Sequence, residues 1–180
     1  MAWQLDTSHS QIGFSVKHMM VSTVRGQFTR FAGTVALDEQ QPERSHVEVT
    51  IDPQSINTSD EKRDGHLRAA DFFEVEKYPE IRFSSTQVER SGDDEYRVTG
   101  DLTMRGVTRP VTLEVTLDGQ SRDLQGQRRA GFSIRGAINR KDFGLVWNVA
   151  LEQGGVLVSD KVSLVIDAEV LEPATVAATA

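Results

Sequence analysis

The chain contains no cysteine among its 180 residues. Disulfide scaffolds, zinc sites built from thiolates and cysteine nucleophiles are therefore excluded. The folded state must draw its stability from side-chain packing and backbone hydrogen bonds. Tyrosine and tryptophan are also scarce, with two of each beside eight phenylalanines, so most of the aromatic rings carry no polar group.

Long apolar runs are missing as well. No stretch reaches the roughly 18 consecutive apolar residues that a membrane-spanning helix requires. The first ten residues contain neither the basic segment nor the apolar segment of a secretory signal. We therefore expect a cytoplasmic protein without a transmembrane segment, or a periplasmic one if a leader was removed.

Basic residues are too few and too dispersed for binding to nucleic-acid phosphates. The chain carries 20 Lys and Arg against 27 Asp and Glu, a net charge of −7, whereas phosphate binding depends on clustered cations. We expect no nucleic-acid partner. Hydrophobic residues make up 38% of the chain, which is enough for one packed core. We predict one domain over residues 1–172 and a flexible C-terminal tail over residues 173–180.

Alternation of apolar and polar residues is the dominant pattern and predicts β-strands. About eight runs alternate, and they begin near Ile12, Phe31, Val47, Ile81, Tyr96, Val111, Phe132 and Val162. Arg105 and Gly106 separate two of the clearest runs and predict a tight turn. Pro110 falls near the start of the returning strand, where its missing N–H is tolerated.

Two segments interrupt this pattern. Phe28 and Phe31 are three positions apart, which breaks the period of two and predicts a bulge or a sharp bend inside one long strand. Residues 58–71 are rich in helix formers and offer Ser59 or Asp60 as a cap, so they predict a short helix in a crossing loop.

Eight strands with one apolar face each must pack as two sheets or close into a barrel. Closure removes the exposed edges, and an eight-stranded barrel has an interior that holds either side chains or one slender ligand. From the residues alone, the favoured interpretation is that the phenylalanines fill a small core. The alternative is that they line a pocket.

Signatures of catalysis and of cofactor binding are absent from the sequence. It has no G-x-S-x-G elbow, phosphate-binding loop or dinucleotide fingerprint. None of the four histidines has the spacing of a metal site; they are His9, His18, His46 and His66. Three acidic residues resemble turn and capping residues more than a catalytic pair: Asp64, Asp71 and Asp142. We predict no catalytic residue, no metal and no cofactor.

Several motifs, in order, carry a resemblance to a known family. They are WQLDTSHS at residues 3–10, IGFSVKH at 12–18, INT at 56–58, RDGHL at 63–67, DFF at 71–73, YPEIRF at 78–83, GDLTMRGVTRPVTL at 100–113 and RKDFG at 140–144. Together they resemble the YceI-like family over roughly residues 3–170. The resemblance implies an all-β fold, an extended eight-stranded antiparallel lipocalin-like barrel with a short helix in a crossing loop. It also implies an interior that holds a polyisoprenoid or a similar long amphiphile such as an isoprenoid quinone.

With this resemblance, the phenylalanines of the strands are better interpreted as the lining of a pocket. Residues of one parity on neighbouring strands are expected to face inward and bind the ligand: Phe14, Val16, Phe83, Leu102, Met104, Phe132, Ile134 and Leu164. Phe28 joins them despite the parity break, and Phe72 and Trp147 are placed on connections that cap the barrel. His18 and His66 complete the predicted ligand-binding set as polar members.

The sequence therefore predicts a protein that sequesters or transports a long-chain isoprenoid or fatty amphiphile, with the loop helix and a few polar groups holding its head near the opening. Five basic residues are candidates for contact with a polar head: Arg25, Lys62, Arg63, Arg105 and Arg140. Two alternatives stay open. One is an enzyme that acts on the amphiphile with His18 or His66 as an acid–base group; the other is a solid-core barrel that works by protein association. A homodimer is compatible with all three.

Overall fold

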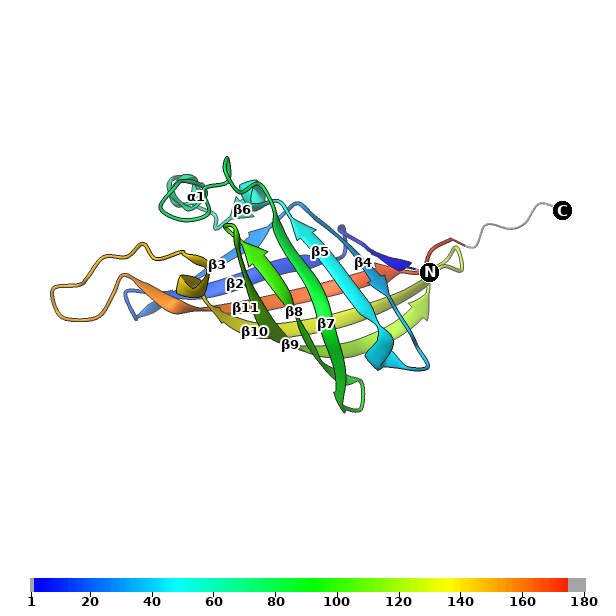
Figure 1. The fold of residues 1–180 in the computed structure, drawn as a ribbon. Coiled ribbons are helices and arrows are strands. Elements are labelled where there is room, and N and C mark those ends of the chain that lie inside the picture. Colours follow the sequence, from blue (N-terminus) through cyan, green and yellow to red (C-terminus); the bar gives the residue numbers. More distant parts are fainter. Residues whose placement is uncertain (1, 175–180) are drawn as a thin grey trace.

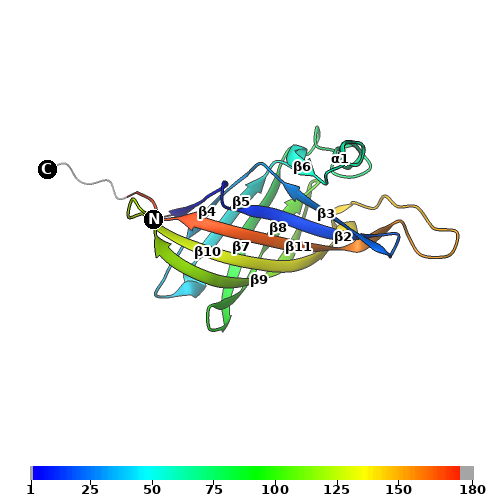
Figure 2. The same cartoon turned by 180° about the vertical axis from the view of Figure 1, so that it is seen from behind.

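The computed structural model describes residues 2–174, in which antiparallel strands close into a barrel (Figures 1 and 2). The strands are β1 (Ala2–Leu5), β2 (Gln11–His18), β3 (Ser22–Phe28), β4 (Phe31–Ala36), β5 (His46–Ile51), β6 (Ile56–Asn57), β7 (Ile81–Gly92), β8 (Glu95–Met104), β9 (Val107–Arg122), β10 (Arg128–Asn139) and β11 (Val158–Leu171). Short 3₁₀ turns lie at Pro42–Arg44, Pro53–Ser55 and Arg140–Phe143. The helix α1 spans Glu61–Arg68.

The sheet order is β1-β4-β5-β7-β8-β9-β10-β11, and β1 also pairs with β11, which closes the ring. β11 also pairs with β2, and seven of the eight residues of β2 take part. In turn, β2 pairs with β3, and β3 pairs with β6. The segments β1 and β2 thus lie one after the other beside β11 and together occupy one strand position of the barrel. The segments β4 and β3 pair with them and together occupy the next strand position. Counting each such pair as one interrupted strand gives a closed eight-stranded antiparallel barrel, as predicted.

The interruption between β3 and β4 explains the broken alternation at Phe28 and Phe31. The backbone N–H groups of Thr29 and Arg30 both donate to the hydroxyl of Ser55, at 3.1 and 3.0 Å. That hydroxyl donates in turn to the Asp52 carbonyl at 2.6 Å. A buried side chain therefore replaces the ladder partners where the long strand bends.

The short helix forms where helix formers follow a capping residue. Asp60 is the cap, and its carboxylate accepts the N–H of Arg63 at 3.0 Å. Asp64 is buried, and its carboxylate accepts the backbone N–H of Thr58 at 2.9 Å. These bonds fix α1 to the strand β6 at one end of the barrel (Figure 1).

The two ends of the barrel differ. The helix end carries α1, the turn after β2, the β8–β9 turn and the connection after β10, whereas the turn end carries the loops after β4, β7 and β9 (Figures 1 and 2). Arg105 and Gly106 form the predicted β8–β9 turn with positive φ at both residues. Pro110 lies in β9 opposite Asp101, outside the stretch 114–122 through which β9 pairs with β10.

Packing is concentrated at the helix end. One buried cluster there includes Phe28, Ile56, Phe72, Met104 and Phe143, and a smaller cluster around Trp3, Ala130 and Val170 lies toward the turn end. Within residues 2–174 no helix is long and apolar enough to cross a membrane. Of the predicted tail, residues 175–180 lie outside the described residues.

Candidate ligand-binding site

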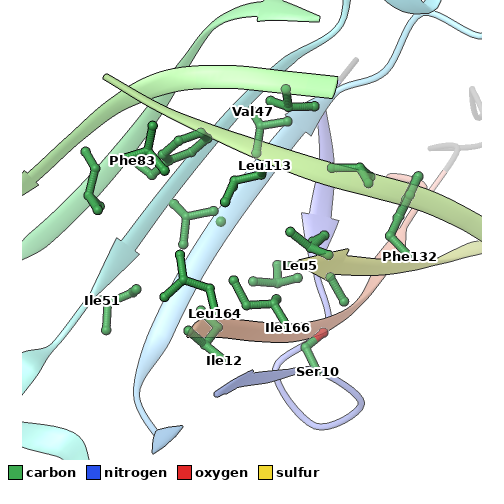
Figure 3. A pocket seen from close by; sticks show the side chains of 18 of the residues that line it. Leu5, Ser10, Ile12, Val47, Ile51, Phe83, Leu113, Phe132, Leu164 and Ile166 are labelled. Carbon is green, nitrogen blue, oxygen red and sulfur yellow. The ribbon is translucent and has the colours of Figure 1, made fainter. Parts of the chain in front are cut away.

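The inward-facing side chains of the strands surround a cavity of about 590 Å³. Figure 3 shows part of its wall, in which side chains from β1, β2, β5, β7, β9, β10 and β11 point toward a common interior. Among the labelled residues only Ser10 presents an oxygen; the others are aliphatic or phenyl groups. A volume of this size is within the range of sites that hold organic ligands.

Ten of the 13 predicted ligand-binding residues lie on the wall of this cavity. They are Phe14, Val16, Phe28, Phe72, Phe83, Leu102, Met104, Phe132, Ile134 and Leu164. The pairing brings them together: Leu164 lies opposite Phe14 and Phe83 lies opposite Leu102. Their contact with a ligand stays a prediction.

Three predicted residues do not line the cavity: His18, His66 and Trp147. His18 ends β2, where it pairs with Ser22 and Val158. The His66 ring packs against Phe72 and Trp147, with centroids 5.1 and 4.7 Å away, and its Nε2 lies 2.9 Å from the Asp71 carboxylate. These rings lie behind Phe72, which itself reaches the cavity, so they support the wall at the helix end.

The middle of the barrel is hollow, because many inward-facing side chains there are only half-buried. Phe14, Phe83, Leu113, Phe132 and Leu164 all point inward and yet keep accessible surface. In a solid core such residues would contact one another and be fully buried. At the helix end, by contrast, the wall residues Phe28, Phe72 and Met104 are buried.

Two glycines make room for the rings of the wall. A Cβ atom on Gly100 would lie 2.5 Å from the Phe83 ring and 2.6 Å from the Ser84 carbonyl oxygen. A Cβ atom on Gly26 would lie 2.4 Å from the Phe14 ring. Each ring therefore lies against a glycine of the neighbouring strand, at a distance that a larger residue there would not allow.

Polar residues of the wall gather at the turn end. They come from the loop after β4, the β7–β8 turn with its strand ends, and the end of β9. The residues are Asp38, Glu39, Gln40, Ser45, Arg90, Asp94, Tyr96 and Gln120. All are exposed or half-buried, so the cavity reaches solvent here. We call this set the polar rim. Three carboxylates accompany one arginine in this set, and Arg128 beside it pairs with the Glu39 carboxylate, so the net charge of the rim is weakly negative.

The basic residues that the sequence offered for a polar head lie elsewhere. Arg25 is exposed on β3, and Lys62 and Arg63 are exposed on α1. Arg105 donates to the carbonyls of Gly144 and Ala70 at 3.0 and 2.9 Å and so ties the β8–β9 turn to its neighbours. Of the five, only Arg140 contributes to the wall.

Arg140 is buried and its guanidinium is committed to the backbone. It donates to four carbonyl oxygens at 2.6–3.2 Å, those of Leu145, Trp147, Val158 and Ser159. Burial lowers the pKa of this group, and Asp160 opposes the shift. Arg140 therefore joins residues 145–147, which follow β10, to residues 158–159, which begin β11.

One group of potential metal ligands occurs among residues 2–174: Asp6, His9 and Glu169. The guanidinium of Arg129 donates to Asp6 at 3.0 Å and to Glu169 at 2.6 Å, so a cation already occupies the place between the carboxylates. This is an ion-pair network. It joins segments that are far apart in the sequence, and no histidine spacing pointed to it.

Many wall residues that the prediction omitted belong to the alternating runs of the sequence. Val98, Ile166 and Val170 line the cavity and share the parity of predicted residues on their own strands, so extending those runs would have found them. The run with Val111, Leu113, Val115 and Leu117 also lines the cavity, but no site residue was predicted on it. The loop residues of the polar rim show no periodic pattern, and only the closed fold brings them together.

Comparison with known proteins gives close relatives and similar structures. Protein YceI of Escherichia coli O157:H7 is 44% identical over 161 residues, which cover 89% of this chain and 81% of that protein. The structure of the Campylobacter jejuni YceI protein is similar with a TM-score of 0.77 and 31% identity, covering 88% of this chain and 90% of that chain. A polyisoprenoid binding domain from Saccharophagus degradans shares the fold with a TM-score of 0.63 and 16% identity, covering 95% of this chain and 98% of that domain.

The family model for the YceI-like domain matches residues 3–170, which contain the whole cavity wall and all of the strands except the first residue of β1 and the last of β11. The chain therefore belongs to the YceI-like family.

Proposed function

We propose that the protein binds a long-chain isoprenoid or a similar amphiphile inside the barrel and sequesters or transports it. The observation that carries this proposal is the apolar cavity of about 590 Å³ whose wall residues are inward-facing but only half-buried. An apolar chain that covers them removes their surface from water, which is favourable by about 25 cal/mol per Å².

The shape of the cavity favours a slender chain. The wall runs from the polar rim at the turn end to Phe28, Phe72 and Met104 at the helix end. Branched aliphatic and phenyl groups line it, and the thioether of Met104 adapts to an irregular chain. The fold shared with the polyisoprenoid binding domain of Saccharophagus degradans supports the same class of ligand.

We further propose that the head of the ligand lies at the polar rim, opposite to the helix. The rim offers hydrogen-bonding groups on Tyr96 and Gln120 beside the carboxylates of Asp38 and Asp94. A diphosphate would meet these carboxylates with unfavourable charge. The rim therefore favours an uncharged head with hydrogen-bond acceptors, such as an isoprenoid quinone.

Binding without a reaction is the favoured activity. The enzyme alternative relies on His18 or His66 as the acid–base group, and neither of them lines the cavity. The half-buried wall also argues against a solid-core barrel. The cytoplasmic location and a homodimer stay predictions, which cell fractionation and light scattering check.

The test uses a bulky side chain placed inside or outside the same strand. Leu164 faces the cavity, and its neighbour Val165 faces outward and is 40% exposed. We expect Leu164→Trp to reduce the isoprenoid recovered per mole of protein by tenfold or more, because the indole occupies the lumen. Val165→Trp should bind as much as the wild type. Organic extraction followed by mass spectrometry measures the amount.

Uptake by the lipid-free protein completes the test. Wild-type protein should take up a long-chain isoprenoid quinone in preference to the matching diphosphate. If neither purified nor reconstituted protein holds any isoprenoid, or if Leu164→Trp holds as much as Val165→Trp, the proposal is wrong.

A further inference from the structure

An apolar tip projects from the helix end of the barrel. It consists of the β2–β3 turn, Met19–Val21, and the hairpin 146–157 of the connection before β11 (Figures 1 and 2). The hairpin is held by a bridge between Ala150 and Val156 and by the bond from the Leu157 N–H to the Val149 carbonyl at 2.9 Å. We call these two segments together the apolar tip.

The two segments form one unit on a fixed base. The Met19 N–H donates to the Leu157 carbonyl at 2.8 Å. The Met20 sulfur lies so close to Gly155 that a Cβ atom there would be 2.6 Å away. At the base, Arg140 and the amide of Asn148 both bond to the Val158 carbonyl, at 3.2 and 2.7 Å. These hydrogen bonds and contacts therefore hold the two segments of the tip together and fix them to the barrel.

Exposed apolar side chains are concentrated on this tip. Eight large hydrophobic residues are exposed among those that the structure describes, and six of them belong to it: Met19, Met20, Val21, Val146, Val149 and Val156. The other two, Leu124 and Val165, are isolated. A cluster of this kind marks a contact surface.

The charge around the tip is weakly positive, whereas the whole chain carries a net charge of −7. Residues 15–25 and 139–161 contain five basic and three acidic residues, but Arg140 among them is buried and Lys141 pairs with Asp160 at 3.2 Å. Lys17, Arg25, Lys141 and Lys161 are exposed on the strands and turns beside the tip. Glu152, at the end of the hairpin, and Asp142 and Asp160 are the acidic members.

We propose that the apolar tip docks the protein on an anionic lipid surface. The methionine and valine side chains enter the apolar layer below the head groups, and the lysines behind them meet the negative phosphates. This contact is independent of what the barrel holds. It also places the helix end of the cavity next to the lipid, since Val158 and Arg140 belong both to the base of the tip and to the cavity wall.

The first experiment uses the absence of native cysteine, which lets one introduced thiol carry an environment-sensitive fluorophore. Val21→Cys labels the tip and Leu124→Cys labels the β9–β10 turn at the other end; both side chains are more than 80% exposed. With vesicles of phosphatidylglycerol and phosphatidylethanolamine, we expect a blue shift and a rise in emission from the probe at residue 21 alone. Equal responses at both sites, or none at residue 21, would overturn the proposal.

The second experiment measures flotation with the same vesicles. The triple variant Met20→Ser, Val21→Ser, Val156→Ser should bind at least tenfold more weakly than the wild type, and Leu124→Ser should bind as well as the wild type. Lys17→Gln with Lys161→Gln should abolish the preference for anionic over phosphatidylcholine vesicles. If instead the triple variant changes a dimer into a monomer and leaves flotation unaltered, a second copy of the chain covers the tip and the proposal fails. The isoprenoid content of each variant, measured separately, reports on the cavity.

Discussion

Individual residues decide whether the barrel is hollow or filled. The rings of Phe83 and Phe14 lie against neighbouring strands because Gly100 and Gly26 leave space for them. A larger residue at either glycine would push a ring into the lumen or distort the strand, because interiors tolerate little excess volume. The glycines therefore contribute to the cavity although they offer it no side chain. Gly100 belongs to the alternating run that begins near Tyr96, but only the folded structure shows which ring each of the two glycines faces.

Gly100→Ala should destabilise the protein by about 1–3 kcal/mol, because the added methyl group meets both the Phe83 ring and the Ser84 carbonyl. The matched control is Gly119→Ala on β9, where a Cβ atom has nothing within 4 Å. We expect the control to stay within about 0.5 kcal/mol of the wild type. Urea unfolding measures both, and equal stability of the two variants would contradict this account of the ring packing.

At the scale of elements, regular strands were predictable and their interruptions were only partly so. Alternation located the eight strands because each has one face toward the interior. The bend after Phe28 was visible as a parity break, whereas the hydroxyl of Ser55 that stabilises it comes from a segment 26 residues away. Asp60 was one of two predicted caps. The connection 140–157 gave no periodic signal, because a buried arginine, not a repeated apolar face, determines its course.

Replacing Arg140 should release this connection from the barrel. Arg140→Met leaves the carbonyl oxygens of Leu145, Trp147 and Ser159 without this donor, while that of Val158 keeps the Asn148 amide, and we expect a loss of at least ~2 kcal/mol in the free energy of unfolding. Limited proteolysis should then cut within residues 146–157. Lys141→Met removes a neighbouring charge that is half exposed and pairs with Asp160 at 3.2 Å, so that variant should resist the protease as the wild type does. A resistant Arg140→Met would show that other contacts hold the connection.

At the scale of the whole molecule, the barrel is closed along β11 by β2 over seven residue pairs and, at the turn end, by a short seam with β1. In the described part of the chain, two residue pairs form this seam, Gln4 with Leu171 and Leu5 with Val170. Beside them Arg129 on β10 binds Asp6, Asp123 and Glu169 at 2.6–3.0 Å and so ties the corner after β1 to two other strands and to the β9–β10 turn. Sequence patterns could not reveal this network, since its members come from four separate segments.

Protonation of Asp6 should weaken the seam in acid. Hydrogen bonds from Ser8, His9 and Arg129 hold the pKa of Asp6 well below its ordinary value. A carboxylate of this kind contributes stability that is fully present above its unfolded pKa of about 3.9 and is lost as the pH falls through the folded value. We expect Asp6→Asn to lower Tm by several degrees at neutral pH, with the difference shrinking below about pH 4.

Thermal unfolding followed from neutral to acidic pH checks this prediction. Asp93→Asn serves as the control, because the Asp93 side chain is fully exposed and lies 3.8 Å from Arg90. Its Tm should follow that of the wild type at every pH. A difference between Asp6→Asn and the wild type that stays constant into acid would mean that the charge of Asp6 does not support the seam.

The half-buried wall of the cavity has a consequence for the lifetime of the protein. A guest that binds only the closed barrel completes its core, and at a hundredfold excess over its Kd it stabilises the folded state by about 2.7 kcal/mol. Proteases act on the unfolded fraction of a protein, which changes tenfold for every 1.4 kcal/mol or so. The steady-state amount of this protein in a cell should therefore rise and fall with the supply of its ligand, without any change in the transcription of its gene.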